Sequence, residues 1–103
     1  MKIVRSTEFT PPKAWDAMDI ANMSGITTRL HWADRPYKWH TNDGEEVFVV
    51  LGGVVEMHYR ENGEEIVEVL QSGDIFFAEE GCEHLAHPRG EARILVIEKE
   101  GSA

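Results

Sequence analysis

The sequence contains a single cysteine, Cys82, and lacks any apolar run long enough to span a bilayer. One cysteine cannot form a disulfide within the chain, and this usage suits a reducing compartment. The N-terminal stretch Met1–Arg5 carries charge but is not followed by the apolar segment of a signal peptide. We therefore expect a soluble, cytoplasmic protein.

Basic residues are scarce as well. The chain has 10 Lys+Arg against 19 Asp+Glu, a formal net charge of −9, and its basic residues form no stripe. This balance argues against nucleic acid or an anionic membrane surface as a partner. It also disfavours polyanionic substrates unless a cation lies in the site. The expected partner is therefore a small-molecule ligand or substrate.

Helical patterns are also missing, whereas short segments rich in Val, Ile and Phe recur with turn residues between them. A loop is expected over 19–25, and turns are expected at Gly52-Gly53, Asn62-Gly63 and 88–90. The pattern predicts about eight short strands, and hence an all-β sandwich or barrel. These strands cover residues 26–32, 37–40, 45–51, 54–60, 65–70, 74–78, 84–87 and 92–98, and a further short strand is expected at Ile3-Val4.

A histidine and a glutamate in the middle of the chain point to a metal site. Glu46 follows His40 and opens an unbroken apolar run that ends at a pair of glycines. A carboxylate in a buried strand is costly unless something pairs with it, and a metal with His40 as second ligand would do so. If Glu46 faces the interior, the two-residue period of a strand places Phe48 and Val50 beside it. His84, which opens a later strand, is the best candidate for a third ligand.

These residues resemble the two motifs of the cupin family. The first motif is matched by His40, Glu46 and Gly53, and the second by Gly73, Gly81 and His84. The resemblance covers residues 26–98 and implies a small jelly-roll barrel, the double-stranded β-helix, with one metal in its lumen. Within the family, the first motif is similar to that of hydroxyanthranilate dioxygenase, but the arginines that bind its substrate have no counterparts at matching positions.

The resemblance also implies the limits of the domain and the set of metal ligands. One domain is expected over 1–103, with an N-terminal arm over 1–25, the barrel over 26–98 and a tail over 99–103. The expected ligands are His40, Glu46 and His84, with Asn42, which stands where the family has a second histidine, as a weaker ligand or a partner of a metal-bound water.

Two histidines and one carboxylate with open positions suit a divalent transition metal, with Fe(II) favoured and Mn, Ni and Zn as alternatives. Two interpretations without a metal-binding role stay open. The three side chains could be a hydrogen-bonded polar cluster that has lost its metal, and Asn42 could be an ordinary loop residue.

Two classes of function are consistent with such a site. The first is a metal-dependent enzyme that acts on a small organic molecule, by Fe(II)-type oxygenation or by metal-assisted isomerisation. The second is a non-catalytic module that binds a small ligand or serves regulation. Catalytic residues are not identified, although Tyr59 is the best titratable side chain expected to face inward. The predicted apolar lining of the pocket consists of Phe48, Met57, Tyr59, Phe77 and Leu95.

The same alternation predicts an apolar outer surface. If Glu46 faces inward, Val47, Val49 and Leu51 face outward, where they would form an exposed hydrophobic patch. We therefore expect a homodimer, with residues 3–4 as an arm for strand exchange. His58 is interpreted as a surface residue, and His87, three residues after His84, as lying on the opposite face of its strand. Trp15 is interpreted as a lid over one end of the core.

Overall fold

The structure is a computed structural model and describes residues 1–102. The last residue of the expected tail, 103, lies outside this range. Within it, no helix is long and apolar enough to cross a membrane. The elements are the 3-10 helix η1 (Ser6–Glu8) and the strands β1 (Ala17–Met23), β2 (Ile26–Ala33), β3 (His40–Thr41), β4 (Glu46–Glu61), β5 (Glu64–Leu70), β6 (Ile75–Ala78) and β7 (Glu83–Lys99).

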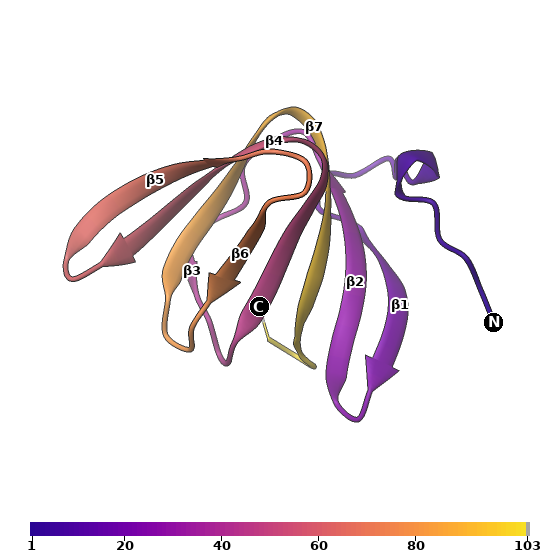
Figure 1. The fold of residues 1–103 in the computed structure, drawn as a ribbon, viewed down its shortest axis with the longest axis horizontal. Helices are drawn as coiled ribbons and strands as arrows, with labels where there is room; N and C mark the ends of the chain where they lie inside the picture. The colour runs from indigo at the N-terminus through magenta and orange to yellow at the C-terminus, as the bar shows by residue number, and fades with distance from the viewer. Residues whose placement is uncertain (103) are drawn as a thin grey trace.

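The long strands β4 and β7 form the centre of the molecule. They pair antiparallel along nearly their whole lengths, from Glu46 opposite Glu98 to Arg60 opposite Glu83. In one half of the pair, β2 flanks β7 and β6 flanks β4, with β1 at the edge beside β2. In the other half, β3 flanks β7 and β5 flanks β4. Figure 1 shows the sheet folding over at the middle of β4 and β7, so that its two halves face each other.

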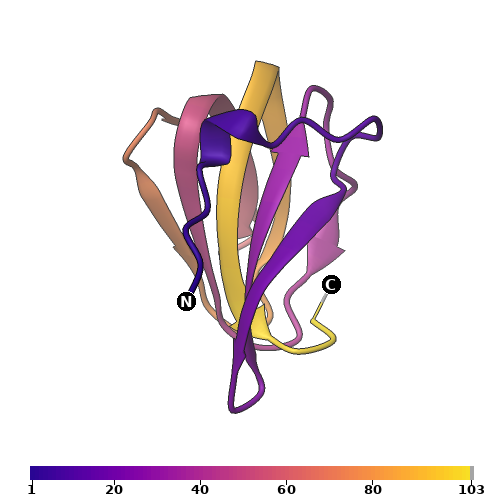
Figure 2. The same cartoon turned by 90° about the vertical axis from the view of Figure 1, so that its right-hand side faces the viewer.

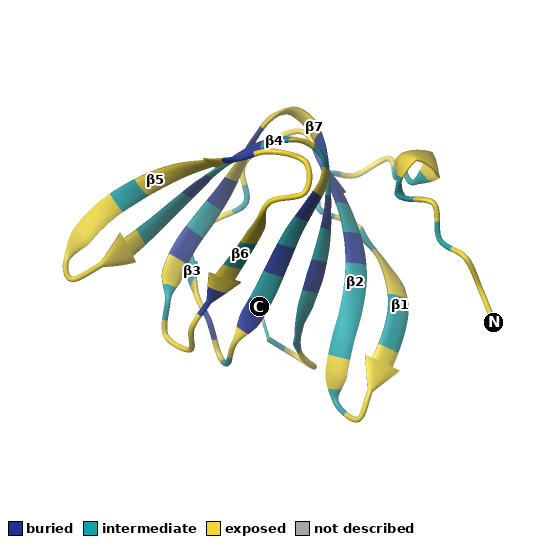
Figure 3. Ribbon diagram, viewed as in Figure 1, coloured by how far each residue is buried: buried dark blue, intermediate teal, exposed yellow. Residues whose placement is uncertain are grey.

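The hydrophobic core lies between these two halves. Burial along the first part of β4 alternates with a period of two, so that Glu46, Phe48 and Val50 are buried, as predicted. Figure 3 shows buried positions alternating along β4 and β7. The buried core cluster consists of Phe48, Val50, Val55, Met57, Leu70, Ala86, Ala92, Ile94 and Val96.

The predicted turn at Gly52-Gly53 is wrong, because β4 continues through both glycines as one bent strand. The pairing with β7 is irregular there, and the buried positions change from even numbers, ending at Val50, to odd numbers, beginning at Val55. Gly53 has a φ of +84°, and a Cβ on it would lie 2.3 Å from the carbonyl oxygen of Glu91. The glycine is needed because the two backbones approach closely, and no turn forms.

The turn expected over 88–90 is also absent from the described chain, since β7 continues through these residues. Pro88 lies opposite Val55, next to the irregular stretch, where a strand tolerates the missing N–H of proline. By contrast, the Asn62-Gly63 hairpin is confirmed. Both residues have positive φ, 53° and 78°, as a tight hairpin turn requires.

The N-terminal part of the chain differs from the expectation as well. Residues 3–4 form no strand, and most of the loop expected over 19–25 is the edge strand β1. An edge strand pairs on one side only, so its polar residues can face solvent, and the alternation of a buried strand is weak there. Arg93 ties the N-terminal segment to its own chain by donating to the carbonyl oxygen of Phe9 (3.0 Å) and to Oγ1 of Thr10 (2.6 Å). Figure 2 shows this segment on the outer side of the sheet.

Candidate metal centre

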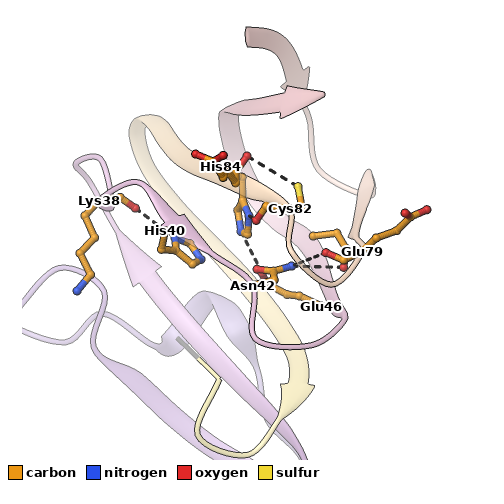
Figure 4. Close-up of polar contacts among 9 residues, drawn as sticks. Lys38, His40, Asn42, Glu46, Glu79, Cys82 and His84 are labelled. Atoms are coloured by element: carbon orange, nitrogen blue, oxygen red, sulfur yellow. Dashed lines mark hydrogen bonds and ion pairs between the residues drawn. The ribbon is translucent and has the colours of Figure 1, made fainter. Parts of the chain in front are cut away.

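Three strands bring the predicted ligands together. His40 in β3 lies directly opposite His84 in β7, and the centroids of the two rings are 4.2 Å apart. Glu46 is the first residue of β4 and points to the same side as the buried Phe48. One donor atom from each of the three side chains lies within 4.8 Å of the other two. The side chains therefore converge on one point, as Figure 4 shows.

The contact between Glu46 and His84 has the spacing of two ligands. Glu46 Oε1 and His84 Nε2 are 3.0 Å apart, and both side chains are almost fully buried. Yet Oε1 has no aligned hydrogen-bond donor among the described residues. Two ligand atoms at a right angle around a metal, with bonds of about 2.1 Å, lie about 3.0 Å apart. The distance of 3.0 Å suits an ion pair as well as two ligands of one cation, and without an aligned donor Oε1 is available to a cation.

Backbone carbonyls set the orientation of both histidines. Nδ1 of His40 faces the carbonyl oxygen of Lys38 at 3.2 Å, and Nδ1 of His84 faces that of Cys82 at 3.4 Å. When Nδ1–H donates to a carbonyl, Nε2 is left as a lone pair, which is the form that binds metal. Burial and the neighbouring His84 both lower the pKa of His40, which favours its neutral form. The residues present thus fit a divalent transition metal.

Asn42 is buried next to this cluster. Its Nδ2 donates to the carbonyl oxygens of Ala78 (3.3 Å) and Glu79 (3.4 Å), and Ala78 is the residue paired with Glu46. These bonds assign the other amide atom as Oδ1. Oδ1 is buried and has no hydrogen-bond partner within residues 1–102. It is an oxygen donor available to a cation or a water, and the loop reading of Asn42 does not account for its burial.

A cavity of about 190 Å³ opens beside the three ligands. Pockets for drug-sized ligands are larger, about 300 Å³ or more, so this one suits a small molecule. One wall is aromatic, with Trp15 and Tyr37 in contact at 5.2 Å between ring centroids. Trp15 therefore lies at the cavity, in keeping with its interpretation as a lid. The lining consists of Trp15, Arg29, His31, Tyr37, His40, Glu46, Phe48, His84, Ala86, Val96, Glu98 and Ser102.

Three charged or titratable residues of this lining were not found from the sequence. Glu98 lies opposite Glu46, and its pKa is raised to about 7 by burial and by the negative charge of Glu46. Arg29 and His31 come from β2, and His31 Nδ1 lies 3.0 Å from the carbonyl oxygen of Trp15. Burial lowers the pKa of His31. Glu98 could have been found from the sequence, because it ends an apolar strand in the same way as Glu46 begins one.

The predicted apolar lining is only partly at the cavity. Phe48 lines it, whereas Met57 is fully buried in the core and Tyr59 packs on Phe76 with 5.4 Å between ring centroids. Phe77 and Leu95 lie on the other face of the sheet, since they pair with the outward-facing Val47 and Val49. The sequence suggests that both are buried but leaves the face undetermined.

The fold has clear counterparts among solved structures. A cupin-2 domain containing protein from Shewanella frigidimarina has a TM-score of 0.76 and 27% sequence identity, over 91% of this chain and 87% of that chain. A Klebsiella pneumoniae protein with a double-stranded β-helix domain has a TM-score of 0.75 and 18% sequence identity, over 100% of this chain and 94% of that chain. The architecture is therefore a double-stranded β-helix. The chain belongs to the cupin superfamily, as its two motifs predicted.

A metal enzyme also shares the fold. The structure of Fe(II)-HppE with the alternative substrate (S)-1-HPP has a TM-score of 0.63 and 18% identity, over 72% of this chain and 42% of that chain. A likeness at this identity concerns the fold only. No protein-family model matches the sequence, and no curated protein matches it either.

Proposed function

We propose that the chain is a metal-dependent enzyme that acts on a small organic molecule, with Fe(II) as the favoured metal and Mn, Ni and Zn as alternatives. The observation that carries this proposal is the arrangement of His40, Glu46 and His84 around one point at the wall of a cavity. Two imidazoles and one carboxylate with open positions are typical of non-haem Fe(II) sites. Fe(II)-HppE, which shares the fold, supports the choice of metal.

The openness of the site favours catalysis over a structural role. A structural metal is normally closed by four protein ligands, whereas a catalytic one keeps a position for substrate. Here the three ligands face a cavity, and Asn42 offers at most a weak oxygen donor in place of a fourth strong ligand. When bound, the metal would polarise a coordinated oxygen atom of the substrate.

The other residues of the cavity suit a small substrate with an anionic group. Phe48 and Val96 line the cavity with apolar surface. Arg29 is the only Lys or Arg in the lining, so its guanidinium is the natural partner of a carboxylate. Glu98, with a pKa of about 7, is placed to hold or release a proton inside the cavity.

Oxygenation and isomerisation are the two reaction types that the ligand set favours. The first test is the metal content of protein purified without a metal-affinity tag. The second is a screen for oxygen uptake, and for isomerisation, with small carboxylic acids after loading with Fe(II) under anaerobic conditions. Turnover that depends on both metal and Glu46 is expected. Metal-free protein that cannot be loaded with any of the four metals would overturn the proposal.

The alternative is a non-catalytic module that binds a small ligand or serves regulation. The small size of the cavity favours it, since about 190 Å³ leaves little room for a substrate beside the metal. A ligand that survives purification and is never transformed would support this alternative, and mass spectrometry of denatured protein would detect it.

We further propose that the protein is a cytoplasmic homodimer. Val47 and Val49 face outward and pair with Phe77 and Ile75, whose exposures are 52% and 64%. Ile97 continues the row on the other side of Val47. An apolar face of this kind on a small domain is typical of an interface. The single cysteine supports a reducing compartment.

A further inference from the structure

A second group of metal-binding side chains lies on the outer surface, in the other half of the folded sheet. Glu56 and His58 point outward from β4, and His87 lies opposite Glu56 in β7. One donor atom from each of the three lies within 4.8 Å of the other two. The rings of His58 and His87 are stacked, with 6.2 Å between their centroids and 27° between their planes. The group shares no residue with the metal centre in the lumen.

The two carboxylate oxygens of Glu56 contact different residues. Arg89 Nε donates to Oε2 at 2.7 Å, which fixes the rotation of the carboxylate. Oε1 is then directed toward Nε2 of His58, at 3.4 Å. A carboxylate held through one oxygen offers the other as a single, oriented ligand.

His58 has one nitrogen turned into this group and the other turned away from it. Its Nε2 is buried and makes no hydrogen bond within the part of the chain that the structure describes. Its Nδ1 faces Glu65 of β5 at 3.6 Å. A carboxylate on the far nitrogen of a histidine favours the tautomer with a free lone pair on the near one, as in the carboxylate–histidine–zinc arrangement. Only Oε1 of Glu56 lies near Nε2, without the alignment of a hydrogen bond, so the lone pair of Nε2 is available to a metal.

We propose that Glu56, His58 and His87 form a second binding site for a divalent transition metal, with Zn²⁺ as the best match. Zn²⁺ accepts imidazole and carboxylate ligands and is often held by three protein donors plus water. Two carboxylates, Glu56 and Glu65, outweigh the single guanidinium of Arg89, so the local charge favours a cation. The site is at the surface, and its fourth position is open to solvent.

The affinity of this site is measured by equilibrium dialysis of the tag-free full chain against buffered Zn²⁺, followed by metal analysis. Wild type is expected to hold one more equivalent than the His58→Ala and His87→Ala variants. Glu46→Ala is expected to keep the outer equivalent. Because His87 is exposed, His87→Ala tests the site without disturbing the core. Equal Zn²⁺ content in wild type and in both histidine variants would overturn the proposal.

This design separates the outer site from the proposed function. If the lumen does not bind metal, wild type and Glu46→Ala each hold one equivalent, and His87→Ala holds none. A matched pair on β5 tests the orientation of His58. Glu65→Gln is expected to weaken Zn²⁺ binding about tenfold, whereas Glu68→Gln, on the other face of the strand, leaves it unchanged. Equal affinities for these two variants would count against the role of Glu65.

Discussion

Glu46 and Glu98 lie directly opposite each other in β4 and β7, and both line the same cavity. Like charges in this position repel, and the cavity offers them little water. Arg29, which also lines the cavity, is partly neutralised by its own contact with Asp19 at 2.7 Å. Burial and this repulsion together raise the pKa of Glu98 to about 7, and a cation bound between the two carboxylates would relieve the repulsion.

Replacing Glu98 should remove a pH dependence of stability. The folded-state pKa of Glu98 is about 7 against an ordinary 4.5, so the folded protein binds more protons than the unfolded chain between these values. The free energy of unfolding then falls as pH rises through this window. In chelator-treated protein, Glu98→Gln should flatten the fall and raise stability above pH 7 by about 1 kcal/mol, because partial exposure reduces the effect. Urea denaturation at several pH values measures it, and identical profiles for the two proteins would contradict the prediction.

Removing the charge of Glu46 should abolish metal binding in the lumen. Glu46→Gln leaves two imidazoles and a neutral amide, which hold a divalent cation far more weakly than a carboxylate does. Glu45→Gln is the matched control, since this neighbour is exposed and removes the same charge. Calorimetric titration with Fe(II) under anaerobic conditions should show a strong loss for the first variant only. Similar losses for both would mean that overall charge, and not ligation, controls binding.

A histidine at position 42 should tighten the site and slow catalysis. Asn42→His supplies a strong donor where Oδ1 is buried without a partner in the described structure. Metal affinity is expected to rise in either functional class. If an open position is needed for substrate, turnover should fall once a substrate is known. Faster or unchanged turnover, measured alongside metal content, would argue against that mechanism.

The outer apolar face should control the oligomeric state. Phe77→Asp places a charge in the row formed with Val47 and Ile97, and it is expected to convert a dimer to a monomer. Met23→Asp is the control, because Met23 is also exposed, at 61%, but lies at the end of the edge strand β1. Light scattering coupled to size-exclusion chromatography distinguishes the two. Wild-type protein that is monomeric at micromolar concentration would refute the dimer.

Two glycines with similar backbone conformations should differ in their tolerance of alanine. Gly53 and Gly63 have φ of +84° and +78°, but only at Gly53 would a Cβ collide with backbone, 2.3 Å from the oxygen of Glu91. Gly63→Ala should cost about 1–2 kcal/mol from the positive φ alone, and Gly53→Ala about 3 kcal/mol or more. Chemical denaturation compares them, and equal costs would show that the close approach relaxes freely.

Local patterns in the sequence predicted the inward face of β4 and most of the strand segments, but they missed the edge strand β1. The alternation around Glu46 is local, and burial of Phe48 and Val50 follows from it. The continuity of β4 and β7 was missed because Gly52-Gly53 and Pro88 look like turns when only neighbours in sequence are considered. Whether a glycine ends a strand or admits a crossing backbone depends on the partner strand, which the sequence does not name.

The residues of the candidate site that belong to a motif could be predicted from the sequence. Those that reach the site only through the pairing register of two strands could not. Glu46 was identified because it is a charged residue at the start of an apolar run, and His84 was identified from the second motif. Arg29 and His31 line the cavity only because of how β2 pairs with β7. His58 was correctly assigned to the polar face of its strand, but its meeting with His87 depends on the cross-strand register.

The change of face at Gly52 and Gly53 makes the number of residues between Val50 and Val55 as important as their identity. Glu46 and Glu56 are both even-numbered, yet one serves the lumen and the other the surface, because this short stretch reverses the alternation. Deleting a single residue here would turn the whole distal half of β4 over, exposing Met57 and burying His58. An insertion in the Asn62-Gly63 hairpin would leave both faces as they are. Changes in chain length should therefore be accepted in the hairpin and rejected at the bend.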